Sequence, residues 1–452
     1  MKRFWLVLLS LGLVMAFSAS AFAGDVKFSG EMYVGGIYLD KTTLKKESTS
    51  DGPSTAFYFQ RLRVNTEFIA APGVSVVTRA DIMERILGGG RSGTGTTADY
   101  DSAGTRAENE NIAFDLAYIR AVTPIGILSA GYIPFGTWGT VFGNSGSPKG
   151  VPGVNLAIPA GDWMLLGWVF KVADSSLTST TTTTAYADGD YDLYLLGIKY
   201  AKKNIEAGIL TGYARQASYK PSASYTREAF VATPYFKATF GPVYLEGELN
   251  VGSGKDKKYE AGVGTADKDV APLQAYLSGT ATFGPAYVGA TVAYYAGDDP
   301  NDSSKTKFDP LFNGIEWSPN LIMWNKDRAY TVGNLNGNFT SVTNATANAT
   351  AFGANFQNAF FWQVRAGVKP TDKLDIMASL SSSTADQNPA AGWVSKEMGY
   401  EIDLTGTYKI TNNLSYMLGG GYLITGDYFK GTNSANQIRN DYMVINKLTL
   451  SF

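Results

Sequence analysis

Apolar and polar residues alternate with a period of two along many segments of the chain, a pattern typical of β-strands that face two different environments. Residues 60–68, 401–410 and 442–452 are clear examples, and in the first two the polar face carries charges. A charged side chain that faces lipid at the midplane of a membrane costs about 2–4 kcal/mol for Arg or Lys. The charged faces are therefore expected to line a water-filled lumen.

Residues 442–452 predict how the sheet ends. The apolar residues of one face are Tyr442, Val444, Leu448, Leu450 and Phe452, with Asn446 as an interruption and Met443 and Ile445 as apolar exceptions on the other face. A soluble domain rarely ends on an unprotected apolar strand, whereas an outer-membrane barrel closes its last strand against its first. The fold class is therefore predicted to be all-β, a transmembrane antiparallel β-barrel. Leu448, Leu450 and Phe452 are expected to form the assembly signal, with the barrel-assembly machinery as a partner.

Tight turns and polar stretches alternate along the chain and allow the strands to be counted. The predicted turns are Ala71-Pro72-Gly73, Pro124-Ile125-Gly126, Lys202-Lys203-Asn204, Phe240-Gly241-Pro242, Phe283-Gly284-Pro285, Lys369-Pro370-Thr371-Asp372 and Thr411-Asn412-Asn413. A barrel of this kind needs an even number of strands. If residues 151–159 form a strand that turns at Ala160-Gly161-Asp162, there are 18 strands, which we prefer, with 16 as the alternative.

The N-terminal residues predict export. Lys2 and Arg3 precede an apolar run from Phe4 to Phe17, and small residues lead to Ala21-Phe22-Ala23. This is the pattern of a secretory signal peptide, here residues 1–23. No linker or shift of composition divides the remainder, so residues 24–452 are expected to form a single outer-membrane barrel domain.

Composition excludes several classes of function. The formal net charge is −2 and neither sign of charge dominates, so we expect no binding to nucleic acid. The chain contains no Cys and no His, which removes thiolate and imidazole catalysis, the usual zinc sites and an axial ligand for c-type haem. No cluster suited to carboxylate, Tyr or Lys catalysis stands out. We therefore expect no enzymatic activity, no cofactor and no metal.

Charged residues on two neighbouring strands are the first candidates for a pore lining. Arg61, Arg63 and Glu67 share one face of the first strand, and by the same alternation Arg79, Asp81 and Arg85 share one face of the next. A turn at Pro72-Gly73 would bring the two sets together. They would form either a basic ladder whose transverse field favours small anions or polar solutes, or an ion-pair network that stiffens the wall, and both can hold at once.

The segment 134–159 is the candidate for a loop that folds into the barrel. It is rich in glycine but carries aromatic rings at Phe135, Trp138 and Phe142, which a freely solvated external loop hardly needs. Packed against the wall, these rings would narrow the channel. The alternative is a loop that lies over the rim or over a neighbouring subunit.

Taken together, the chain resembles the general outer-membrane porins, and most closely the homotrimeric porins of anaerobic delta-type proteobacteria. The resemblance rests on the signal peptide followed by residues 26–31, on residues 59–64 and on the C-terminal Phe452. It implies a Gram-negative outer membrane, a trimer, a third loop bent inward, and passive diffusion of ions and small hydrophilic solutes. The inward loop of the family usually carries acidic residues, whereas residues 134–159 contain only one charge, Lys149. This departure predicts a pore that leans toward anions.

Two other functions are compatible with such a barrel. One is a substrate-specific channel for sugars or organic acids. The other is a structural or interaction barrel, such as an adhesin or the sheath of an electron conduit. A conduit would need a haem-bearing partner, because this chain has no Cys-Xaa-Xaa-Cys-His motif and no His ligand.

Overall fold

The structure is a computed structural model of the chain. It describes residues 25–46, 53–87, 112–174, 189–218, 220, 223–307, 311, 320–325, 328, 331–333, 335–338 and 356–452, without the side chains of 145–149. The predicted signal peptide, the polar residues 88–108 and most of the polar residues 174–189 lie outside these ranges. No helix in the described ranges has the length and apolar character needed to cross a membrane.

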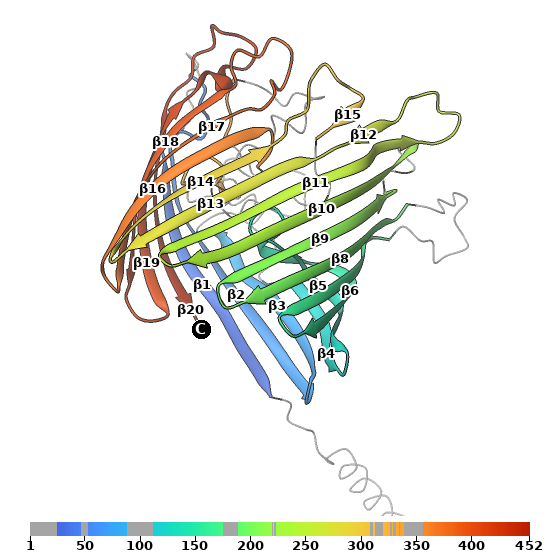
Figure 1. The fold of residues 1–452 in the computed structure, drawn as a ribbon. Coiled ribbons are helices and arrows are strands. Elements are labelled where there is room, and N and C mark those ends of the chain that lie inside the picture. The colour runs from blue at the N-terminus through green and yellow to red at the C-terminus, as the bar shows by residue number, and fades with distance from the viewer. Residues whose placement is uncertain are drawn as a thin grey trace, which may run out of the picture.

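Eighteen long antiparallel strands make up the described part of the barrel (Figure 1). They are β1 (Val26–Leu39), β2 (Thr55–Ala71), β3 (Val74–Ile86), β4 (Ile112–Thr123), β5 (Gly126–Thr137), β6 (Asn144–Ala160), β7 (Trp163–Ala173), β8 (Tyr191–Lys202), β9 (Ile205–Gln216), β10 (Tyr225–Phe240), β11 (Val243–Tyr259), β13 (Leu273–Phe283), β14 (Ala286–Tyr295), β16 (Ala359–Thr371), β17 (Leu374–Thr384), β18 (Glu397–Lys409), β19 (Leu414–Thr425) and β20 (Asp441–Ser451). Short strands β12 (Lys268–Val270) and β15 (Lys305–Thr306) and the 3-10 helix η2 (Asp427–Lys430) belong to the long connections.

The sheet closes on itself between its first and last strands. β1 pairs antiparallel with β20 from Glu31 opposite Ser451 to Leu39 opposite Met443. Beyond this ladder, the backbone N–H of Gly30 donates to the carbonyl of Phe452 at 2.8 Å, and Phe452 N–H donates back to Gly30 at 3.0 Å. From Gly30 to Leu39 of β1 this closure leaves no unpaired edge at the seam, as a barrel in lipid requires.

The connections alternate between short and long, which orients the barrel. All the predicted tight turns, and the one at residues 160–162, join consecutive strands at one end, where β1 also begins and β20 ends (Figure 1). Short turns are typical of the periplasmic side, and the long connections therefore lie outside. The prediction of 18 strands is confirmed, because residues 151–159 are indeed part of a strand, β6, which turns at Gly161 and Asp162.

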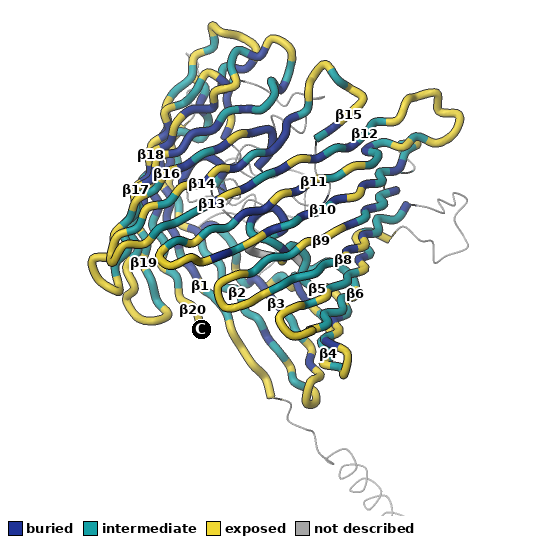
Figure 2. The backbone as a smooth tube through the Cα atoms, viewed as in Figure 1, coloured by how far each residue is buried: buried dark blue, intermediate teal, exposed yellow. Residues whose placement is uncertain are grey.

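The outer face of the barrel is apolar. Large side chains with more than half of their surface exposed include Phe114 (68%), Leu196 (70%) and Leu404 (58%). Along strands such as β18 and β20, exposed positions alternate with covered ones (Figure 2). On β18 the inward neighbours Glu401 and Asp403 are buried, as the alternation predicts. A closed barrel with an apolar outer surface satisfies its backbone inside lipid. The chain is accordingly a protein of the bacterial outer membrane.

Candidate pore constriction

The charged ladder predicted on β2 and β3 exists, and its arginines are paired with carboxylates. Arg63 forms a bidentate pair with Asp81 of β3: its Nε donates to Oδ1 at 2.6 Å and its Nη2 to Oδ2 at 2.5 Å. Arg79 forms a second bidentate pair, with Asp115 of β4. Asp115 is an extra residue at a register irregularity in β4: Arg79 of β3 pairs with Leu116 and Ala80 pairs with Phe114, so that Asp115 lies between the two pairs. This irregularity turns the carboxylate to the same side as the guanidinium.

Two further arginines extend the ladder toward both ends of the barrel. Arg61 lies between two carboxylates, 3.8 Å from Glu31 and 3.5 Å from Glu84. Arg120 lies 3.7 Å from Glu67, which also accepts a 2.8 Å hydrogen bond from Ser75. The ladder is thus compensated in charge along its length. The ion-pair interpretation accounts for this geometry, and the compensation removes much of the basis for a preference for anions.

Arg85 does not share a face with Arg79 and Asp81, so this part of the predicted ladder is wrong. The register between β2 and β3 shifts between Gln60 and Leu62, where β3 carries one extra residue. Met83 within this bulge has a positive φ of 53°. A bulge changes the phase of the alternation. Glu84 consequently takes the lumen side beside Arg61, whereas Arg85 lies opposite Gln60 on the other face.

The inward loop is confirmed, but it is much shorter than residues 134–159. β5 continues to Thr137 and β6 begins at Asn144, so only residues 138–143, here called loop 138–143, connect the two strands. Phe135 remains on β5, where its ring meets Phe170 edge-on at 5.4 Å. Trp138 and Phe142 belong to the loop and are buried.

Loop 138–143 lies along the inner wall and contacts strands β8 to β11. The indole N–H of Trp138 donates to the carbonyl of Thr233 at 2.9 Å, and its ring stands edge-on to Tyr235 at 5.1 Å. Two wall glycines make room for the indole: a Cβ added at Gly197 would lie 3.2 Å from the Trp138 ring, and one at Gly208 only 2.8 Å from it. The wall is therefore recessed where the loop lies against it.

A single carboxylate holds the tip of this loop. Glu248 of β11, which is 4% exposed, accepts the backbone N–H groups of four consecutive residues: Thr140 (2.7 Å), Val141 (2.6 Å), Phe142 (3.2 Å) and Gly143 (2.8 Å). The hydroxyls of Thr140 and Thr233 add two more donors, at 3.0 and 3.2 Å. Successive N–H groups that converge on one anion form a strong, charge-assisted site.

A second segment is held inside the barrel in the same way, and the sequence did not predict it. Segment 320–325 belongs to the long connection between β14 and β16. The buried Glu401 of β18 accepts the backbone N–H groups of Leu321 (2.9 Å), Ile322 (2.7 Å) and Met323 (2.6 Å). A Cβ added at Gly419 or Gly421 of β19 would meet the Leu321 side chain at 3.1 or 3.2 Å. The pattern of a carboxylate and two small wall residues is thus repeated.

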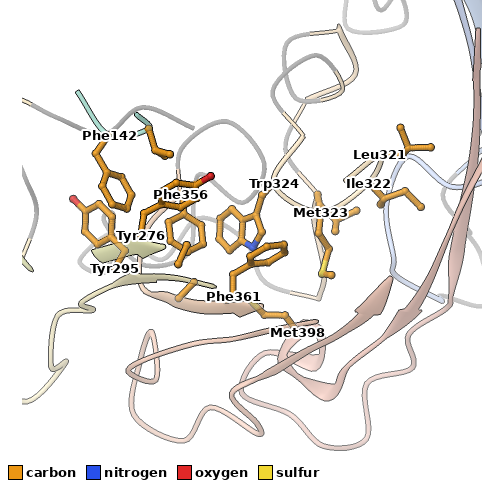
Figure 3. Close-up of a cluster of buried hydrophobic side chains, with 14 of the residues drawn as sticks. Phe142, Tyr276, Tyr295, Leu321, Ile322, Met323, Trp324, Phe356, Phe361 and Met398 are labelled. Atoms are coloured by element: carbon orange, nitrogen blue, oxygen red, sulfur yellow. The ribbon is translucent and has the colours of Figure 1, made fainter. Parts of the chain in front are cut away.

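The apolar side chains of both insertions belong to one buried cluster. Figure 3 shows Phe142 of loop 138–143 near Tyr276 and Tyr295, with Phe356, Trp324 and Phe361 continuing the row. The Trp324 and Phe356 rings meet edge-on at 4.9 Å, and the Trp324 indole donates to the Ser383 hydroxyl at 3.1 Å. The lumen is therefore filled by protein on this side rather than lined by water.

A buried arginine accompanies the second insertion. Arg328, three residues beyond segment 320–325, is 1% exposed and donates through Nη1 to the carbonyl of Gly333 at 3.0 Å. Burial lowers the pKa of its guanidinium, while the charges of Asp441 and Glu401 act in the opposite sense. The side chain thus brings a positive charge into the carboxylate-rich surroundings of Glu401.

Below loop 138–143, toward the periplasmic turns, the lumen wall encloses a cavity of about 500 Å³. One side is charged: Glu206 lies 2.8 Å from Lys199 and 3.5 Å from Lys237, and accepts a hydrogen bond from Tyr235 at 2.9 Å. The adjoining strand β7 adds the apolar residues Met164, Leu166 and Trp168 to the lining, and Met164 is the register partner of Lys199. Within the described ranges no three acidic side chains are grouped so as to hold a metal ion.

Comparison with known proteins supports the fold. No protein-family model matches the chain, and no curated protein matches it. Solved structures do. OccK9 (OpdG) of Pseudomonas aeruginosa has a TM-score of 0.51 and 15% identity, covering 94% of this chain and 99% of its own. OpdO of the same organism has a TM-score of 0.51 and 14% identity, covering 95% and 98%.

A double variant of OccD1 (OprD) gives a TM-score of 0.50 at 14% identity, covering 96% of this chain and 100% of its own. At such low identity the likeness shows a shared architecture, that of the 18-stranded outer-membrane porins. The general resemblance to porins is thus supported. The finer resemblance to homotrimeric porins of anaerobic proteobacteria stays a prediction.

Proposed function

We propose that this protein is an outer-membrane diffusion channel for ions and small hydrophilic solutes. The observation that carries the proposal is the closed barrel whose inward face on β1–β4 is a ladder of paired charges. Such a wall holds water, and the barrel of 18 strands is wide enough to leave a channel beside the inserted loops.

The compensated ladder supports weak selectivity between small anions and cations. Each arginine of the ladder has a carboxylate within ion-pair distance, so little net field remains along this wall. Selection by size and polarity would then outweigh selection by charge. The homotrimer implied by the resemblance is retained as part of the proposal.

Single-channel conductance of the refolded mature protein in a planar bilayer tests the proposal. We expect stepwise openings whose size rises with salt concentration without saturation, grouped in threes, and a small reversal potential across a salt gradient. Absence of any conductance in correctly folded protein would overturn the open channel.

A substrate-selective channel is the second candidate, and the cavity below loop 138–143 favours it. The cavity lining combines charged and apolar residues, which suits a small solute with an apolar body and a polar head. The charged residues are Lys199, Glu206 and Lys237, and the apolar ones are Met164, Leu166 and Trp168. Such a solute should block ion current in a saturable way. A set of small organic acids and sugars, tested for saturable block with Trp168→Ala as the comparison, separates this candidate from simple diffusion.

A further inference from the structure

Two buried glutamates of the wall hold chain segments that would otherwise be free to leave the lumen. Glu248 accepts four consecutive backbone N–H groups of loop 138–143, and Glu401 accepts three of segment 320–325. Both face inward on long strands of the barrel, β11 and β18. We call each such carboxylate, with its backbone donors, a clamp.

The charge of a clamp matters more than the bulk of its side chain. Backbone N–H groups that point inward need acceptors once they are buried, and an ionised carboxylate offers only acceptors. Of the Glu248 oxygens, Oε2 serves three N–H groups and the Thr140 hydroxyl, while Oε1 serves Gly143 and Thr233. An amide at this position would turn an N–H₂ donor toward other donors. No neutral side chain of the same shape can replace the clamp.

We infer that Glu248 and Glu401 are positioning residues that set the width of the channel, by clamping two insertions whose apolar side chains belong to one buried cluster inside the barrel. This cluster contains Phe142 from one insertion and Trp324 from the other, with Tyr276, Tyr295 and Phe356 between them (Figure 3). Each clamp is backed by glycine recesses in the neighbouring wall, Gly197 and Gly208 for Trp138, and Gly419 and Gly421 for Leu321. The effect on solute size rests on the proposed channel function, whereas the clamps themselves do not.

Thiol labelling tests the clamp directly, because the natural chain contains no cysteine. Val141 of the loop is 1% exposed, so a Val141→Cys thiol should react slowly with a water-soluble maleimide in the folded barrel. In the Val141→Cys/Glu248→Gln protein we expect labelling to be at least about tenfold faster, because reaction of a buried group follows the population of its open state. The matched control is Glu246→Gln on the same strand, whose carboxylate accepts the Tyr244 and Tyr276 hydroxyls and no loop N–H group that the structure shows.

The second clamp has its own version of the test. Ile322 is 0% exposed in the native chain, and the thiol of Ile322→Cys should react with the maleimide when Glu401→Gln is present as well. It should stay unreactive when combined with Glu397→Gln, a substitution at an exposed position of the same strand. Where a Glu→Gln barrel fails to fold on a heat-modifiability gel, Glu248→Asp, which keeps the charge but shortens the reach, should give an intermediate labelling rate.

Conductance and polymer exclusion on the same proteins then show what the clamps do to the channel. Release of a clamped segment in the Glu→Gln proteins should raise the single-channel conductance and allow larger polyethylene glycols to enter the channel. Equal labelling rates in the Glu→Gln proteins and their controls would overturn the clamps. Faster labelling of the Glu→Gln proteins with unchanged conductance and an unchanged size limit would overturn the role of the clamps in setting the channel width. If the Glu→Gln proteins are labelled faster than their controls but no barrel conducts, only the proposed channel function is overturned.

Discussion

Arg63 and Asp81 face each other across β2 and β3 and are joined by two parallel hydrogen bonds, of 2.6 and 2.5 Å. Both side chains are largely covered, with 13% and 6% of the side-chain surface exposed. Planar, bidentate pairs of this kind fix geometry as well as charge. The pair therefore both stiffens the wall and keeps the field along it small.

Removing either partner should uncover the charge of the other. We expect Asp81→Asn to shift the reversal potential toward anion preference, because Arg63 loses its counter-charge, and Arg63→Gln to shift it toward cations. Each variant should also destabilise the barrel by about 3–5 kcal/mol, the usual cost of leaving one charge of a buried pair unpaired. Reversal potentials and thermal unfolding of the folded barrel measure the two effects.

Lys203→Gln is the control for this pair of variants. It removes one positive charge, as Arg63→Gln does, but lies in the exposed periplasmic turn between β8 and β9. Its reversal potential should stay close to that of the natural chain. Equal shifts in Lys203→Gln and Arg63→Gln would mean that total charge, rather than the ladder, governs selectivity.

The recess under Trp138 gives a second prediction. A Cβ at Gly197 would lie 3.1 Å from Leu210 and 3.2 Å from the Trp138 ring, both side-chain contacts. Gly197→Val should therefore push the indole out of its place, at a cost of about 1–3 kcal/mol for overpacking. Labelling of Val141→Cys should become faster, and conductance should become noisier.

Gly406→Val on β18 makes the same substitution where an added Cβ would meet nothing within 4 Å. This variant should leave labelling and conductance unchanged. If both valines have the same effect, the loss of a strand glycine, and not the displaced indole, is responsible.

Much of the barrel follows from local sequence. The alternation on β2, β18 and β20 gave the correct faces, and the turns with Gly, Pro and Asn gave the strand order, because both depend on neighbouring residues only. The bulge at Met83 had no such signal, since a positive φ is uncommon at a residue other than glycine and no glycine or proline lies nearby in β3. One extra residue was enough to exchange Glu84 for Arg85 on the lumen side.

The two clamps were harder to predict, because a glutamate on a lumen face is expected in any porin and its partners lie far along the chain. Met443 and Ile445, the apolar exceptions on the inward face of β20, are buried at 1% and 4% exposure in the cluster that the insertions form. The run Gly419-Gly420-Gly421 marks the recess for Leu321. Apolar residues and glycines on an inward face are thus a signal that protein, rather than water, lies against that wall.

The assignment of lipid and lumen faces can be tested with neighbouring residues of β18. Leu404 is 58% exposed on the outer face, whereas Thr405 is partly covered on the inner one. Leu404→Arg should destabilise the barrel by about 2–4 kcal/mol if the residue lies near the midplane of the bilayer. Thr405→Arg, which places the same charge in water, should cost much less. Unfolding in lipid vesicles by denaturant measures both, and equal losses would contradict the assigned faces.

The seam between β1 and β20 carries the last prediction. The Phe452 backbone exchanges two hydrogen bonds with Gly30, while its ring is 52% exposed on the outer surface and lies so close to Gly30 that an added Cβ would come within 2.8 Å of it. Phe452→Ala keeps the backbone pair but removes the ring. If Leu448, Leu450 and Phe452 form the assembly signal, this variant should reach the outer membrane in several-fold lower yield, yet unfold at nearly the same denaturant concentration once refolded in vitro. Phe240→Ala, a similarly exposed ring at the periplasmic end of β10, is the control and should assemble normally. A loss of stability without a loss of yield in Phe452→Ala would instead assign the ring a purely structural role at the seam.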